Sequence, residues 1–189
     1  MSVAGCLQMH GGGMRDWLDA HDLRTAWAEC PRGDWMLSLA ISAGVDQRLI
    51  VRAAGTCAHL ALSAVPTDEL RPLRCLRVLE AWVDGNADAE MVREAKLEAE
   101  RARISFAMAP ARNPAAALAC AAVVCAASLV RPLALRDQLA TADGVTSGAW
   151  AAFGDPQNPA RAAVKAECAR IIRCLIPIEA VEAAMEANP

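Results

Sequence analysis

Apolar residues recur along this chain at the three- and four-residue spacings of helices that bury one face. The pattern predicts helices over residues 15–30, 35–44, 48–65, 69–85, 89–109, 114–130, 133–142, 160–176 and 179–187. No stretch shows the alternation of polar and β-branched residues that is typical of a strand. We therefore expect an all-α fold, a compact bundle of about seven to nine helices whose chain neighbours mostly run antiparallel because their loops are short.

The junction between the first two helices carries the strongest local signals. Pro31-Arg32-Gly33 ends the first helix, because proline cannot continue a helix and glycine suits the turn. Asp34 is then placed to cap the next helix by accepting backbone N–H bonds. A break near Asp22 is an alternative for the first helix. Trp27 and Trp35 flank the turn, and we expect them to anchor the packing of both helices.

Two segments lack a helical pattern. Residues 1–13 are expected to be a flexible leader, with Met14 as an alternative start to Met1, and residues 14–189 a single helical domain. The segment 143–160, DGVTSGAWAAFGDPQNPA, is expected to be the longest irregular region. Its glycines, prolines and asparagine are typical of loops.

Composition narrows the class of protein. Hydrophobic residues make up 55% of the 189 positions but aromatic residues only 4%, so alanine-rich helices that pack closely are expected. The most apolar stretch, residues 115–130, is shorter than a membrane span of about 20 residues, and it is expected to be a central core helix. The net charge is −3, and no basic run favours nucleic acid. Eight cysteines without a signal peptide indicate buried thiols in a cytoplasmic protein.

The residues that carry chemistry do not form a recognisable catalytic or metal-binding motif. There is no CxxC and no HExxH, and Cys57-x-His59 is a weak spacing for zinc. His21 and His59 are the plausible bases for a nucleophilic cysteine, and no third group that would orient them is evident. Glu90, Glu94 and Glu98 are interleaved with cations, as on a solvated helix face. We expect no enzymatic activity, no cofactor and no metal.

Several phrases of the sequence together resemble a family of alanine-rich, all-helical bacterial and phage proteins labelled immunity proteins of bacterial toxin systems. The phrases are AWAECPRGDWMLSLAISAGVD, LIVRAAGTCAHLAL, VPTDELRPLRCLRVLEAWVDG and CARIIRCLIPIEAVEAA, and they cover most of residues 22–187. The most specific elements are Trp27-Ala28-Glu29-Cys30 and Gly33-Asp34-Trp35. The resemblance implies a non-enzymatic protein that binds and neutralises a partner. The family's middle tract is rich in alanine and aspartate, often with tyrosines, whereas this chain has NPAAALACAAVVCAASLV there.

We therefore expect a non-enzymatic helical binding protein that neutralises a protein partner, either a toxin or, for a phage-encoded chain, a host defence component. The candidate binding residues are aromatic or charged, as interface anchors are: Trp27, Arg32, Asp34, Trp35, Arg52 and Arg71. One alternative is a protein that sequesters a small molecule such as a nucleotide signal, in which tryptophans stack on the base and Arg52 or Arg71 binds phosphate. A helical scaffold or adaptor is another, and a homo-oligomer is compatible with each.

Overall fold

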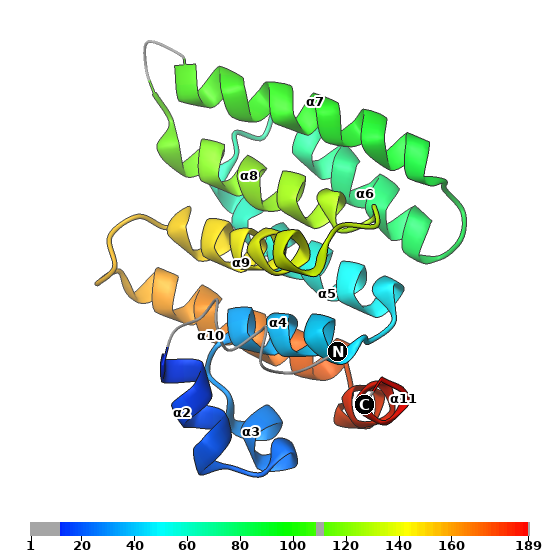
Figure 1. Cartoon of the computed structure of the whole chain (residues 1–189). Helices are drawn as coiled ribbons and strands as arrows, with labels where there is room; N and C mark the ends of the chain where they lie inside the picture. Colours follow the sequence, from blue (N-terminus) through cyan, green and yellow to red (C-terminus); the bar gives the residue numbers. More distant parts are fainter. Residues whose placement is uncertain (1–11, 109–111, 189) are drawn as a thin grey trace.

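The chain folds into helices that are stacked on one another (Figure 1). The computed structural model describes residues 12–108 and 112–188, and this part contains ten α-helices, one 3-10 helix and no β-strand. The elements are α2 (Gly12–Ala20), α3 (Leu23–Glu29), α4 (Gly33–Ala43), α5 (Gln47–Leu60), η1 (Ala61–Ala64), α6 (Arg71–Val83), α7 (Ala89–Met108), α8 (Pro114–Ser128), α9 (Leu135–Ala151), α10 (Pro159–Leu175) and α11 (Ile178–Ala187). The all-α expectation is confirmed.

The number of helices exceeds the expected seven to nine because the first predicted helix is two helices. The break falls at His21 and Asp22, where the carboxylate of Asp22 accepts the backbone N–H of Thr25 at 3.0 Å and so begins α3. Residues 12 and 13 of the predicted leader belong to α2, and residues 1–11 lie outside the described part of the chain.

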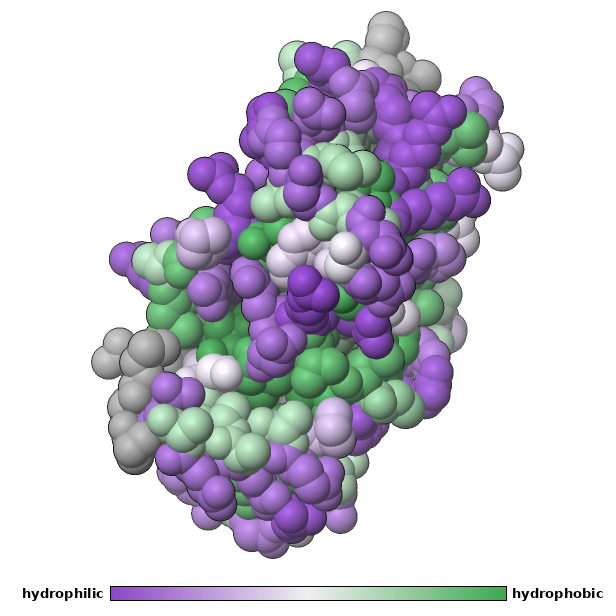
Figure 2. Space-filling model, turned by 90° about the vertical axis from the view of Figure 1, so that its right-hand side faces the viewer, coloured by the Kyte–Doolittle hydropathy of each residue, from purple (hydrophilic) through white to green (hydrophobic). Residues whose placement is uncertain are grey.

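Helix α7 lies at one end of the stack, and α2, α3 and α11 lie at the other (Figure 1). From α7 through α8 and α9 to α10 the chain reverses direction at each connection, as expected for helices joined by short loops. Helix α5 occupies the middle, where it contacts α4, α6, α8, α9 and α10. Seen from the right-hand side of this view, the surface of the stack carries apolar patches between polar residues (Figure 2).

Helix α8 is the central apolar helix that the sequence predicts. Asn113 caps it by accepting the N–H of Ala116 at 3.0 Å, and Pro114 occupies its first turn. Its buried residues are small: Ala116, Ala119, Cys120, Ala122, Val123, Ala126 and Ala127. Small side chains let α7 and α9 pack on α8 at close range, which accounts for the high alanine content. Within the described residues, no helix is long and apolar enough to cross a membrane.

The expectation of an irregular segment over 143–160 holds for residues 152–158 but is wrong for residues 143–151, because α9 continues to Ala151 and α10 begins at Pro159. Gly144 and Gly148 lie inside this helix, where they face α8. A Cβ on Gly148 would lie 3.1 Å from the carbonyl oxygen of Leu118 and 3.2 Å from the backbone nitrogen of Ala122. A Cβ on Gly144 would lie 2.9 Å from Cys125 Sγ. These glycines therefore permit close helix packing and do not form a turn.

Candidate functional site

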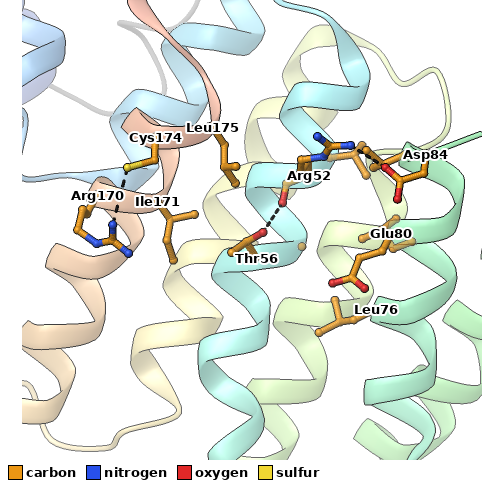
Figure 3. A pocket seen from close by; sticks show the side chains of 13 residues that line it. Arg52, Thr56, Leu76, Glu80, Asp84, Arg170, Ile171, Cys174 and Leu175 are labelled. Carbon is orange, nitrogen blue, oxygen red and sulfur yellow. Dashed lines mark hydrogen bonds and ion pairs between the residues drawn. The ribbon is translucent and has the colours of Figure 1, made fainter.

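A groove of about 590 Å³ lies over α5, between α6 and α10 (Figure 3). Its apolar lining comes from Val51 and Gly55 of α5, Leu76, Leu79 and Val83 of α6, and Ile171 and Leu175 of α10. The figure shows Ile171 and Leu175 pointing from α10 towards α5. The groove exists because α6 and α10 both pack on α5 but stand apart from each other. It is an open concave surface with an apolar lining, as binding sites commonly are.

The rim of the groove is charged. On the α6 side, Arg52 donates from Nη2 to Asp84 Oδ1 at 2.7 Å, and both side chains are about half exposed. Such an exposed pair contributes little to stability, on the order of 0–1 kcal/mol, so it is available to a ligand. Thr56 lies beside it and donates its hydroxyl to the carbonyl oxygen of Arg52 at 2.8 Å.

On the α10 side, Arg170 donates from Nε to Glu167 at 2.8 Å, and this bond raises the pKa of the guanidinium. Its Nη1 also lies 3.7 Å from the Cys174 sulfur, which is exposed and lines the groove. Glu80 projects from α6 and forms no ion pair within residues 12–108 and 112–188. The α6 side of the groove thus carries Glu80 and the Arg52–Asp84 ion pair, and the α10 side carries Arg170.

Of the six residues predicted for binding, only Arg52 lines this groove. The remaining residues of the groove lining come from α5, α6 with Asp84 at its C-terminal end, and α10, which are far apart in the sequence, so no local motif marks them. One signal was present in the sequence. Glu80 near the end of α6 and Asp84 directly after that helix are spaced four apart, beside the apolar positions Leu76, Leu79 and Val83. This spacing places carboxylates along the edge of an apolar helix face.

The structure brings four predicted residues together at the junction of α3 and α4. Arg32 donates from Nε to Asp34 Oδ1 at 2.9 Å, and this hydrogen bond raises the pKa of the Arg32 guanidinium. The Arg32 guanidinium carbon also lies 4.7 Å from the centre of the Trp35 ring. Asp34 is buried, whereas Arg32 is partly exposed. The junction is closed from α10 by Arg173, which donates to the Cys30 carbonyl oxygen at 2.7 Å.

The prediction that Asp34 caps the second helix is wrong. Helix α4 begins at Gly33, Asp34 is its second residue, and the capping position is Arg32, which forms no side-chain cap bond. The carboxylate bonds to the Arg32 guanidinium instead. A Cβ on Gly33 would lie 3.1 Å from the backbone of α10, at Ala169 N and at the carbonyl carbon of Cys168. Glycine is therefore used here for the close approach of α4 and α10.

Trp27 and Trp35 pack between helices, as the sequence predicts. Trp27 is only 4% exposed and lies in the core, and its Nε1 has no hydrogen-bond partner among the described residues. Trp35 is partly buried, and a Cβ on Gly13 of α2 would lie 3.5 Å from its ring. Together with Met14, Trp17 and Met36 they surround a gap of only about 10 Å³. This corner fixes α2 and α3 to α4 and leaves no room for a ligand.

Arg71 lies apart from the other predicted residues. Its Nε donates to Glu69 Oε1 at 2.8 Å, a bond that raises the pKa of Arg71 and lowers that of Glu69. Arg71 begins α6 and Asp84 follows its end, so Arg71 and the Arg52–Asp84 pair are about 20 Å apart along that helix. A tryptophan does meet two cations elsewhere: Arg161 lies 4.7 Å and Lys165 5.1 Å from the Trp150 ring. None of the three residues of that cluster is among the six residues predicted for binding.

Most of the cysteine thiols, and His21, are held in packing contacts within the fold. Five thiols are buried, as expected: Cys30, Cys57, Cys75, Cys120 and Cys168. The expectation is wrong for Cys174, which is exposed at the groove, and holds only in part for Cys125, which is half-buried, while Cys6 lies outside the described residues. Burial raises the pKa of Cys75 and of Cys120 to about 12. His21 stacks on Trp17, and its Nδ1 lies 2.8 Å from the Trp17 carbonyl oxygen. In residues 12–108 and 112–188, no three His, Cys, Asp or Glu side chains are grouped so that they could hold a metal ion.

Comparison of the chain with protein-family models, with curated proteins and with solved structures found no match. The candidate site therefore rests on the geometry of the groove alone.

Proposed function

We propose that this chain is a non-enzymatic binding protein that neutralises a protein partner by holding a segment of that partner in the groove over α5. The observation that carries the proposal is the open groove of about 590 Å³ between α6 and α10. A groove of this kind suits an amphipathic helix, which lays its apolar face on a hydrophobic floor and its polar edges along the rim. Inhibition by such binding requires no chemistry from the chain itself.

The charges on the rim indicate the orientation of the partner segment. Glu80 and Asp84 line the α6 side and Arg170 lies on the α10 side. A bound helix with basic residues along one flank and acidic residues along the other complements both edges. Complementary charges mainly fix register and speed association, whereas the apolar floor supplies most of the affinity. A toxin or a host defence component is the class of partner we propose.

Thr56→Trp tests the proposal. Thr56 is exposed and lines the groove, so an indole there fills the space that a partner helix needs without entering the core. Thr67→Trp is the matched control, because Thr67 is also exposed but lies in the turn before α6, outside the groove lining. Tagged chains are expressed with the candidate toxin or defence component, and co-purification and growth rescue are measured.

We expect the wild-type chain and Thr67→Trp to hold the partner in a fixed molar ratio, and Thr56→Trp to lose it with unchanged helicity. Equal retention by Thr56→Trp would contradict binding in the groove. The volume of the groove also lies within the range of about 300–1,000 Å³ for small-molecule sites, so a nucleotide signal is the second candidate. A thermal-shift panel of cyclic nucleotides tests it, and a flat response across the panel rejects it.

A further inference from the structure

We propose that a second copy of this chain docks on the outer face of α7, forming an antiparallel two-fold pair of α7 helices. Helix α7 is the outermost helix at one end of the stack (Figure 1). Its inner side buries Val92, Ala99 and Ala102 against its neighbours. The end helix of a stack normally presents a polar outer face to stay soluble. The outer face of α7 instead exposes large hydrophobic side chains.

Exposed large hydrophobic side chains are concentrated on this one helix. Met91 is 49% exposed, Leu97 43%, Ile104 47% and Met108 79%, and only Leu70 and Leu118 share this property elsewhere in the described chain. They recur with Glu94 and Arg101 at spacings of three, four or seven residues, which places them along one side of the helix. A shallow hollow of about 560 Å³ borders this line on the side of α6, with Val78 of α6 and Met91, Leu97 and Arg101 of α7 in its lining.

One pair of opposite charges on α7, Glu94 and Arg101, is complementary to itself when the helix is reversed. Glu94 and Arg101 are equally far from the midpoint between Leu97 and Glu98, and so are Met91 and Ile104. A two-fold axis through that midpoint therefore sets each Glu94 opposite Arg101 of the second copy. It also sets each Met91 at the level of Ile104 of the second copy. The two Leu97 side chains lie next to the axis. Such an isologous contact closes on itself as a dimer.

Intramolecular contacts leave these groups accessible. Arg101 is 68% exposed, and its one ion pair among the described residues is with Glu98, three residues earlier on the same helix. An exposed pair of this spacing contributes a few tenths of a kcal/mol, about 0.3–0.5, so it does not hold Arg101 away from a second chain. A single pair of helices buries less than the roughly 1,200 Å² of a standard interface, so the dimer is expected to be weak.

The full-length chain is tested by sedimentation equilibrium from about 1 µM to about 500 µM, a range that brackets a weak interface. We expect the apparent mass to rise with concentration from 20.0 kDa towards twice that value. Leu97→Glu should hold the chain monomeric, whereas Leu118→Glu, an exposed leucine on α8, should dimerise like the wild type. A monomer at every concentration, or an undiminished dimer of Leu97→Glu, overturns the proposal.

Charge reversal tests the antiparallel register. Glu94→Arg sets arginine against arginine at both pairs, and Arg101→Glu sets glutamate against glutamate, so each variant alone should be monomeric. An equimolar mixture restores both opposite-charge pairs in the heterodimer, so it should dimerise. A mixture that stays monomeric overturns the pairing. Far-UV circular dichroism of each variant verifies that the helices are intact, and the readout is independent of any groove partner.

Discussion

Gly148 and Gly55 both lie in helix interiors. Replacing each by alanine separates the gain in helix propensity from the cost of overpacking, which oppose each other. Alanine gains about 1 kcal/mol of helix propensity over glycine at an unconstrained position. At Gly148 the new Cβ meets backbone atoms of α8 at 3.1 and 3.2 Å, so two helices must separate. Overpacking of this kind costs about 1–3 kcal/mol. With a cost near 2, Gly148→Ala should lose about 1 kcal/mol of unfolding free energy.

At Gly55 the same methyl group meets only Leu79 Cδ2, at 3.1 Å. Leu79 is buried at the floor of the groove, but the atom that must give is the end of a flexible side chain and not helix backbone, so it can shift by a few tenths of an ångström at a smaller cost. Gly55→Ala should therefore keep most of the propensity gain and stabilise the chain by up to about 1 kcal/mol.

Urea unfolding followed by circular dichroism measures both changes in unfolding free energy, and the slope of that free energy against urea concentration should stay the same. The melting temperature should move by about 2–4 °C per kcal/mol for a domain of this size. The two variants are expected to shift in opposite directions. If Gly148→Ala stabilises the chain as much as Gly55→Ala does, α8 and α9 are not held at backbone contact and the explanation of α9 is wrong.

Two further predictions concern the corner of α3 and α4 and the buried thiols. Trp35→Ala should lower the free energy of unfolding by about 2–3 kcal/mol; lost partner binding with an unchanged melting temperature would instead make Trp35 a binding residue. In the folded chain the thiols of Cys75 and Cys120 have a pKa of about 12, whereas in the unfolded chain their pKa is near the ordinary value of 9.0. Stability should thus hold below pH 8 and fall above pH 9 by up to about 1.4 kcal/mol per thiol and pH unit. Urea titrations in reductant should show a shallower decline for the double alanine variant.

The helix boundaries were predictable wherever a local signal sets them. Asp46 accepts the N–H groups of Arg48 and Leu49, Asn113 caps α8, and Gly44 ends α4 with a left-handed φ of 84°. Each of these residues acts within a few positions of itself, so the sequence alone specifies the contact. Pro72 likewise lies in the first turn of α6, where a helix tolerates proline.

The errors arose where the partner of a residue is distant in sequence. Gly144 and Gly148 favour a loop by propensity, but their lack of a side chain is what α8 requires at close range, and packing outweighs propensity. Asp34 has the residue type and position of a cap, but the Arg32 guanidinium holds its carboxylate instead. The groove was not predictable because it is the space left between α6 and α10, about 90 residues apart.

The two proposed surfaces lie on different sides of α6, and this separation gives them different roles. Helix α6 packs on α7 with one face and lines the groove over α5 with another. A dimer through α7 therefore leaves both grooves open and carries them on the outer flanks of the pair. Thr56→Trp then acts on the groove alone and Leu97→Glu on the pairing alone. A partner that is itself dimeric gains affinity from two linked grooves without any new contact. For such a partner Leu97→Glu weakens capture, whereas a monomeric partner binds this variant as tightly as the wild type.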